Sequence, residues 1–171
     1  MLKRRTEKPI ESMASILILG GVVPLCVALL GQYAFGLFPC HFCLLQRYPY
    51  ALAILCGVAS LLVKRMGPAW HAAVLIGALA FATTGAIGAY HTGVERGLIN
   101  YTGGCVADSG FQGSLSDLKA QIMAAPRVSC ADATPFFLHL SMASWNTIFA
   151  IAMLVLMALQ YRFERSLRVH H

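Results

Sequence analysis

Charged residues are scarce in this chain: they make up 12% of its 171 residues, and only seven residues are acidic. A soluble domain usually carries about 25% charged residues, so the composition argues against a soluble globular protein. The sequence also lacks a glycine-rich phosphate loop, a nucleophile elbow and a catalytic carboxylate pair. These absences argue against nucleotide-dependent, α/β-hydrolase and glycosidase chemistry. Internal repeats and low-complexity tracts are absent as well.

Hydrophobic residues are abundant, at 58% of the chain, and they gather in long runs. A membrane-spanning helix needs about 20 mostly apolar residues and satisfies its own backbone polar groups. We therefore expect an all-α membrane protein, a four-transmembrane-helix bundle that forms a single integral membrane domain over residues 1–171. The second run is short, so its helix is expected to extend back toward the preceding cysteine. The expected spans cover about residues 15–38, 45–63, 70–90 and 136–161.

The basic residues indicate how the chain is oriented in the membrane. Nine of the 13 Lys and Arg residues flank the apolar runs on one face: Lys3, Arg4, Arg5, Lys8, Lys64, Arg65, Arg162, Arg165 and Arg168. By the positive-inside rule, both termini are expected in the cytoplasm, with outward loops at about 39–47 and 91–135. No nucleic-acid partner is expected, because the basic residues mark membrane flanks. The first run is the alternative candidate for a secretory signal, but it is long for one and no clear cleavage site follows.

The six cysteines all avoid the cytoplasmic flanks. Cys40 and Cys43 lie in the first outward loop, and Cys105 and Cys130 lie in the second. Disulfides persist outside the cytoplasm, and chance would seldom place four thiols there as two pairs. The other two cysteines lie inside the first two apolar runs, where a cysteine behaves as a small hydrophobe: Cys26 and Cys56.

Residues 40–43 form a CxxC motif, whose spacing serves zinc binding, haem attachment or redox chemistry. Attachment of c-type haem needs a histidine directly after the second cysteine, and Leu44 stands there. A zinc site with four cysteines usually has two close pairs, whereas Cys105 and Cys130 are 25 residues apart. We therefore favour redox chemistry and expect no resident metal. A zinc site and purely structural disulfides are the alternatives.

The surroundings of the CxxC motif favour a reactive thiolate. Cys43 precedes the second apolar run and so lies near a helix N-terminus, where the helix dipole stabilises a thiolate. Arg47 is one helical turn further on and is expected to lie over Cys43 and to donate hydrogen bonds to a carbonyl oxygen. Its alternative role is to extend to the lipid headgroups. His91, with Glu95 one turn on, is a candidate hydrogen-bond donor or proton carrier, or simply an interfacial residue.

The second outward loop is expected to contain a short amphipathic helix over residues 114–125. This segment opens with a capping-box-like sequence, places apolar residues at helical spacing and ends before Pro126. It would lie on the outer membrane surface or pack against the outer ends of the bundle. Cys105 and Cys130 flank it, so a disulfide between them would be accessible to a thiolate of another protein or would act as a structural staple.

Three sequence blocks and the second cysteine pair resemble the DsbB family of disulfide bond formation proteins, which are bacterial inner-membrane quinone reductases. The resemblance covers nearly the whole chain, and its most specific part is the first block together with Cys105 and Cys130. The second loop is richer in glycine than in the type member, which affects the docking of a partner more than the redox residues. The blocks are residues 39–49 (PCHFCLLQRYP), 90–95 (YHTGVE) and 140–146 (LSMASWN).

The resemblance implies a protein-dithiol:quinone oxidoreductase on the periplasmic side of the bacterial inner membrane, which sustains disulfide formation in exported proteins. A reduced DsbA-type, thioredoxin-like oxidase would attack a Cys105–Cys130 disulfide, most readily at Cys105. The freed Cys130 would exchange with a Cys40–Cys43 disulfide, and Cys43 would face a membrane quinone, either ubiquinone or menaquinone. The residues expected to contact the quinone are Arg47 and His91.

Other interpretations use the same cysteines differently. A membrane zinc or scaffold protein would hold metal, or disulfides that resist reduction. A reductive thiol relay would need a cysteine pair reachable from within the membrane, and only Cys26 and Cys56 qualify; their replacement is expected to leave activity intact. Vitamin K epoxide reductase–like proteins share the four-helix plan, but their CxxC lies late in the chain, whereas here it follows the first apolar run.

Overall fold

The computed structural model describes residues 2–63, 67–100, 135–137 and 140–169. Five helices are described: α1 (Leu2–Ala34), α2 (His41–Leu45), α3 (Arg47–Leu62), α4 (Pro68–Glu95) and α6 (Met142–Val169). Two short strands pair antiparallel directly before α6: β1 (Pro135–Phe137) and β2 (Leu140–Ser141). The structure of this part of the chain is thus almost entirely helical.

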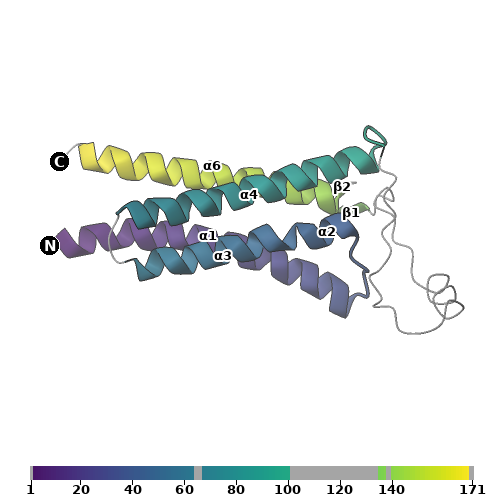
Figure 1. Cartoon of the computed structure of the whole chain (residues 1–171), viewed down its shortest axis with the longest axis horizontal. Coiled ribbons are helices and arrows are strands. Elements are labelled where there is room, and N and C mark those ends of the chain that lie inside the picture. Colours follow the sequence, from purple (N-terminus) through teal and green to yellow (C-terminus); the bar gives the residue numbers. More distant parts are fainter. Residues whose placement is uncertain (1, 64–66, 101–134, 138–139, 170–171) are drawn as a thin grey trace, which may run out of the picture.

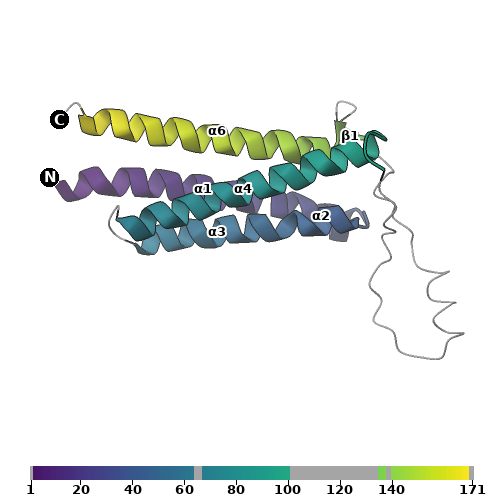
Figure 2. The ribbon, with the colours of Figure 1, turned by 45° about the horizontal axis from the view of Figure 1, so that its top comes forward.

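The long helices form an elongated bundle (Figure 1). Helix α1 packs against α3, α3 against α4 and α4 against α6, while smaller contacts join α1 to α6. Leu2 and Val169, the first and last described residues, lie at one end of the bundle, whereas α2 and the two strands lie at the other (Figures 1 and 2). The CxxC motif, at the start of α2, is therefore at the end of the bundle opposite the termini.

Four helical stretches are long and apolar enough to cross a membrane: Glu11–Ala34, His41–Leu62, Pro68–Glu95 and Met142–Phe163. Large apolar side chains such as Leu19, Leu55 and Leu79 are exposed on the outside of the bundle. Soluble monomers rarely expose extended apolar surface to water, whereas in a membrane such a surface contacts apolar lipid tails. The predicted all-α bundle of four membrane helices is confirmed. The cytoplasmic location of the termini stays a prediction, and the helix predicted over 114–125 lies outside the described residues.

Local features make α1 end earlier, and α6 begin later, than the spans expected from the apolar runs. Helix α1 ends at Ala34, because Gly36 has a left-handed backbone with φ of 64° and the Leu37 amide donates to the Gly31 carbonyl. Helix α6 begins only at Met142, because the Ser141 side chain accepts a hydrogen bond from the amide three residues on, at 3.2 Å. This is the geometry of an N-cap.

A one-residue break at Gln46 separates α2 from α3. Pro49 has no amide hydrogen, so it cannot donate to the Leu45 carbonyl; it is tolerated in the first turn of a helix that starts at Arg47. The Gln46 carbonyl accepts a hydrogen bond from Thr84 Oγ1 of α4 at 3.3 Å. The break therefore leaves α2 as a separate short helix, which packs against α4.

Interhelical hydrogen bonds tie the bundle together. The Tyr50 hydroxyl of α3 donates to Asn146 Oδ1 of α6. The amide nitrogen of Asn146 in turn donates to the carbonyl and the hydroxyl oxygen of Thr84 in α4, both at 3.3 Å. In a membrane, polar side chains satisfy one another across helices in this way. Three of the four membrane helices are thus joined through these residues.

Gly21 allows α1 to approach α3 closely, and we expect Gly21→Ala to destabilise the protein. A Cβ at this position would lie 2.6 Å from Ile54 Cγ1 and 2.7 Å from the backbone oxygen of Tyr50. Because backbone cannot rotate away, the helices must separate, at a cost of about 1–3 kcal/mol. The midpoint of thermal unfolding in detergent should fall. Gly31→Ala in the same helix is the matched control, because among the described residues its Cβ would meet only Leu37 Cδ1, at 3.6 Å. Equal midpoints for the two variants would contradict the close approach.

Candidate active site

The CxxC motif occupies the first turn of α2. Cys40 is the N-cap residue, with an extended backbone (φ −73°, ψ 170°), and its Sγ accepts a hydrogen bond from the Cys43 amide at 3.3 Å. The first amides of a helix have no partner within the helix, so the cysteine takes the part that serine or aspartate usually plays. The turn thereby brings both sulfur atoms together at the start of α2.

The two sulfur atoms of the motif nearly touch. Cys40 Sγ lies 2.8 Å from Cys43 Sγ, and the two sulfur atoms are not joined by a disulfide bond. A disulfide bond is about 2.0 Å long, so oxidation of the pair requires only a small movement. Cys40 is 5% exposed, whereas Cys43 is half-buried. A molecule arriving from outside the bundle therefore reaches Cys43 more easily.

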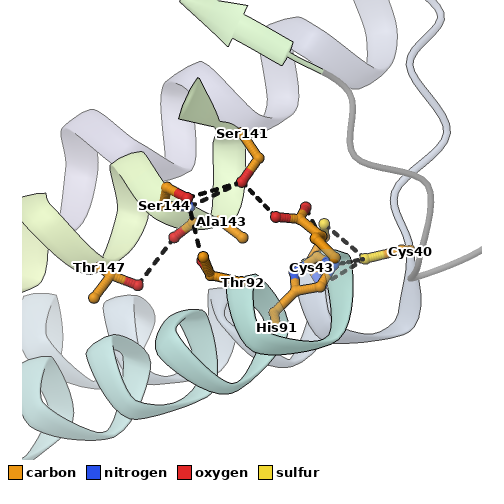
Figure 3. Close-up of polar contacts among 9 residues, drawn as sticks. Cys40, Cys43, His91, Thr92, Ser141, Ala143, Ser144 and Thr147 are labelled. Carbon is orange, nitrogen blue, oxygen red and sulfur yellow. Dashed lines mark hydrogen bonds and ion pairs between the residues drawn. The ribbon is translucent and has the colours of Figure 1, made fainter. Parts of the chain in front are cut away.

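Helix α4 brings His91 to this cysteine pair. His91 Nε2 lies 3.7 Å from Cys40 Sγ, and the side chain is buried. The ring of Phe42 packs against the imidazole, with ring centroids 5.3 Å apart. Figure 3 shows His91 on α4 beside the two cysteines. An imidazole in this position is able to exchange a proton with the Cys40 thiol after a small approach.

A network of oxygen atoms continues from His91 toward α6 (Figure 3). Glu95 Oε1 lies 3.7 Å from His91 Nε2, and the Ser141 hydroxyl donates to the other carboxylate oxygen. Ser141 contacts Ser144 at 3.1 Å, and Ser144 contacts Thr92 at 3.3 Å. The Glu95 side chain is only 7% exposed. Because a buried carboxylate is costly unless it is paired, the network holds Glu95 beside the imidazole.

The contacts within the cluster also set the pKa of the Cys40 thiol, which lies outside the membrane-spanning stretches. The hydrogen bond to Cys43 and burial together raise the pKa of Cys40 to about 12, although the contact with His91 acts in the opposite direction. Cys40 is therefore a thiol at neutral pH when the pair is reduced, and it donates its proton toward Cys43. Since the thiolate is the nucleophile, this arrangement favours Cys43 as the reactive sulfur.

We expect Cys40 in the reduced protein to react with iodoacetamide slowly at neutral pH. Its rate should rise about tenfold per pH unit toward its pKa, because only the thiolate reacts. Replacing its strongest partner in a Cys43→Ala variant should lower the pKa of Cys40 and so accelerate its labelling at neutral pH. The measurement is mass spectrometry of the alkylated peptide over time; equal rates at Cys40 in the two proteins would contradict the shared hydrogen bond.

Arg47 begins α3 and has a partner that its spacing did not predict. Its Nη1 donates to Gln32 Oε1 of α1 at 2.7 Å. Its Nε is buried without a hydrogen-bond partner among the described residues, and so is Nε2 of the neighbouring Gln46. Buried donors normally have partners. Each is a donor able to bind an acceptor oxygen of a ligand.

The family model for disulfide bond formation protein DsbB matches residues 11–160 of this chain. The chain belongs to the DsbB family. An uncharacterized protein of Rickettsia prowazekii (strain Madrid E), RP370, is 26% identical over 153 residues, which are 88% of this chain and 87% of the relative. No solved structure matches the chain at a significant level. Membership of the DsbB family identifies a multi-pass membrane oxidoreductase of disulfide bond formation.

The structure brings some of the site residues predicted for a DsbB protein together. Cys40, Cys43 and His91 meet in one cluster, and Arg47 begins α3, separated from the same short helix by one residue. The second predicted pair, Cys105 and Cys130, lies outside the described residues, so its role and its pairing stay predictions. Of the two remaining cysteines, one is exposed on α1 and the other is buried in the bundle core: Cys26 and Cys56.

Sequence reasoning missed three polar residues of this DsbB protein. Ser141 was quoted only as part of a motif, yet it both caps α6 and binds the Glu95 carboxylate. Gln46 and Gln32 were given no role, although one supplies a buried donor and the other binds the Arg47 guanidinium. The signal available was their place at the ends of apolar runs, where an uncharged polar side chain needs a partner.

Proposed function

We propose that this DsbB-family protein is a protein-dithiol:quinone oxidoreductase. It reoxidises a DsbA-type, thioredoxin-like dithiol oxidase and passes two electrons to a membrane quinone, either ubiquinone or menaquinone. Disulfide formation in exported proteins is sustained in this way. The observation that carries the proposal is the contact of Cys40 with both Cys43 and His91, which unites an oxidisable dithiol with a proton carrier.

The proposed location is the bacterial inner membrane, with the CxxC motif on the periplasmic side. In the sequence, nine of the 13 basic residues come before the first span, between the second and third spans or at the end of the fourth span, and such flanking residues favour the cytoplasm. The CxxC motif is at the opposite end of the bundle (Figure 1). That end would face the compartment in which disulfides persist and a soluble dithiol oxidase operates.

Electrons enter the protein by thiol–disulfide exchange. The partner's thiolate attacks a Cys105–Cys130 disulfide at Cys105, and the freed Cys130 thiolate attacks a Cys40–Cys43 disulfide. Each exchange forms one S–S bond as it breaks another. The partner's second thiolate then displaces Cys105 from the first mixed disulfide, and the Cys105 thiolate displaces Cys40 from its mixed disulfide with Cys130, which restores the Cys105–Cys130 disulfide. The net result is an oxidised partner and a reduced CxxC pair. A partner of this type is a strong oxidant, with a potential of about −120 mV, so its reoxidation needs a stronger electron acceptor than a thiol buffer.

The residues after the CxxC motif fit a quinone headgroup. A quinone carbonyl accepts hydrogen bonds and donates none, and the Arg47 and Gln46 side chains offer buried donors that lack partners among the described residues. Arg47 and His91 would hold the headgroup, and Gln46 is an additional donor for it. When bound, the quinone supplies an acceptor for two electrons and two protons.

The proton on Cys40 must leave when the CxxC disulfide re-forms. Cys40 holds that proton firmly, because its pKa is raised to about 12. His91 Nε2, at 3.7 Å, is the base positioned to take it. Glu95, 3.7 Å from the same nitrogen, stabilises the imidazolium that forms. Cys43, as the thiolate, supplies the electron pair.

Glu95→Gln is expected to slow turnover about tenfold. This is less than the roughly 10²–10⁴-fold rate enhancement that general acid–base catalysis contributes, because His91 itself is retained. The amide keeps the size of the side chain and its contact with Ser141, but it loses the charge that stabilises a protonated His91. The steady-state rate of quinone reduction measures the effect. Glu11→Gln, which changes an exposed carboxylate of α1, should have no effect. Equal rates for the two variants would show that the Glu95 charge plays no part in proton transfer.

The proposed function is tested by quinone reduction with the detergent-purified protein. A reduced thioredoxin-like oxidase is supplied as the electron donor, and the absorbance of ubiquinone or menaquinone is followed. Turnover should require the partner, and Cys105→Ser should stop it, whereas the matched Cys26→Ser variant should retain it. Absence of turnover with both quinones, from protein whose four outer cysteines are oxidised, would refute the proposal and favour a structural role for these cysteines.

A further inference from the structure

The cluster of Cys40, Cys43 and His91 has a chemical capacity that disulfide exchange does not use. The two sulfur atoms and a ring nitrogen of the histidine all lie within 4.8 Å of one another. Thiolate sulfur and imidazole nitrogen are the ligands that Zn²⁺ and similar divalent ions prefer. We propose that the reduced protein binds one thiophilic divalent ion at this cluster, and that the bound ion blocks the redox site.

The distances require little rearrangement for a tetrahedral ion. Zn²⁺ lies about 2.3 Å from sulfur and about 2.0–2.1 Å from nitrogen, which separates neighbouring ligand atoms by roughly 3.5–3.8 Å. Cys40 Sγ and His91 Nε2 are already 3.7 Å apart. The two sulfur atoms, 2.8 Å apart, must separate by about 1 Å.

Charge balance favours binding of a divalent ion at this buried cluster. Two thiolates and a neutral imidazole carry two negative charges, which a divalent ion cancels, so that the complex as a whole is neutral. A neutral complex avoids the cost of burying an unpaired thiolate. The Glu95 carboxylate, 3.7 Å from His91 Nε2 and 7% exposed, adds negative potential that attracts a cation. Water is left as the fourth ligand, as in other sites with three protein ligands.

Only the reduced protein offers these ligands. In a Cys40–Cys43 disulfide both sulfur atoms are bonded to each other and carry no charge, so the ion has one nitrogen ligand left. Binding to the dithiol releases the thiol protons and involves no electron transfer. The ion would therefore trap the protein in its reduced state, and it would be displaced by a chelator rather than by an oxidant.

This site differs from a zinc site made of four cysteines, because it needs neither Cys105 nor Cys130. The test therefore uses a Cys105→Ser/Cys130→Ser protein, full-length, reduced and free of oxygen, titrated with Co²⁺. We expect saturation at one Co²⁺ per chain, with thiolate-to-cobalt charge-transfer absorption and the visible bands of tetrahedral Co²⁺. Added Zn²⁺ should abolish these bands, and the oxidised protein should not develop them.

Further variants identify the ligands. In the same background, Cys40→Ser should remove the charge-transfer absorption. His91→Gln should weaken Co²⁺ binding more than about tenfold, because loss of a residue that only hydrogen-bonds to a metal ligand already lowers metal affinity by about 10–100-fold. His41→Gln, which changes the exposed histidine between the two cysteines, is the matched control and should bind as before. Absence of cobalt–thiolate absorption in the folded, reduced protein would overturn the proposal, as would Co²⁺ binding that survives Cys40→Ser. The titration uses neither partner nor quinone, so its failure is distinct from a failure of the proposed oxidoreductase function.

Discussion

Cys43→Ser is expected to abolish quinone reduction, lowering turnover by roughly 10⁴-fold or more, as removal of a reacting nucleophile does. Cys43 accepts the hydrogen bond of Cys40 at 2.8 Å and is the more accessible sulfur of the pair. A serine hydroxyl neither forms a disulfide nor ionises at neutral pH, so the variant has no CxxC disulfide to take electrons from Cys130 and no thiolate to pass them to the quinone. The rate of quinone absorbance loss with a reduced partner oxidase measures the effect.

Cys26→Ala is the matched control for the loss of a thiol. Cys26 is exposed on α1 and takes no part in the CxxC cluster, so this variant should keep full turnover. In the Cys43→Ser protein, the Cys40 thiolate should attack Cys130 of the proposed Cys105–Cys130 disulfide and release the Cys105 thiolate. Non-reducing electrophoresis with peptide mass mapping would detect the resulting Cys40–Cys130 disulfide. Retained turnover in Cys43→Ser would mean that the CxxC pair is not the electron donor to the quinone.

Arg47→Met is expected to raise the KM for quinone by about tenfold to 100-fold, with a smaller effect on kcat. A hydrogen bond from a charged donor contributes about 1.5–3 kcal/mol, and the unpartnered Nε of Arg47 is the donor proposed for a quinone carbonyl. Methionine keeps a long side chain against the bundle but offers no donor. Initial rates over a range of quinone concentrations separate KM from kcat.

Arg96→Gln is the control for the loss of a positive charge at the same end of the bundle. Arg96 is exposed at the C-cap of α4, so its replacement should leave the KM for quinone unchanged. Arg47 also binds Gln32 of α1, so thermal unfolding must be measured for each variant. A lower unfolding midpoint with an unchanged KM would show that Arg47 only joins the helices.

The helices could be predicted from the sequence because lipid imposes a length and a composition on each span. Their ends could not, because they depend on local features that an average over an apolar run does not include. The left-handed backbone at Gly36 ends α1 before residue 38, and the Ser141 side chain starts α6 after residue 136. Pro49 likewise explains why the second span is divided at Gln46.

Those parts of the candidate site whose residues are neighbours in sequence could be predicted. The contacts between residues on different helices were harder to predict, because they depend on how the helices pack. The CxxC spacing places Cys40 and Cys43 together in any helical turn. The contact of His91 with Cys40 depends on the packing of α2 against α4, so the sequence predicted only a shared end of the bundle. Helical spacing predicted that Arg47 lies over Cys43, and that placement stays a prediction.

The partners on other helices were not predicted at all. The hydrogen bond from Ser141 to Glu95 joins residues 46 positions apart, and the one from Arg47 to Gln32 joins residues 15 positions apart. Such pairs depend on how helices rotate against one another, which a single sequence does not specify.

A single-turnover reaction between the reduced protein and a quinone tests electron transfer from the CxxC pair most directly. In a Cys105→Ser/Cys130→Ser protein, Cys40 and Cys43 are the only cysteines left besides Cys26 and Cys56. The reduced protein is mixed with ubiquinone or menaquinone without a partner, and quinol and alkylatable thiols are counted together. We predict one quinol per protein molecule and the loss of two thiols, mapped by peptide mass to Cys40 and Cys43. Both thiols remaining while the quinone stays oxidised would contradict the proposed function.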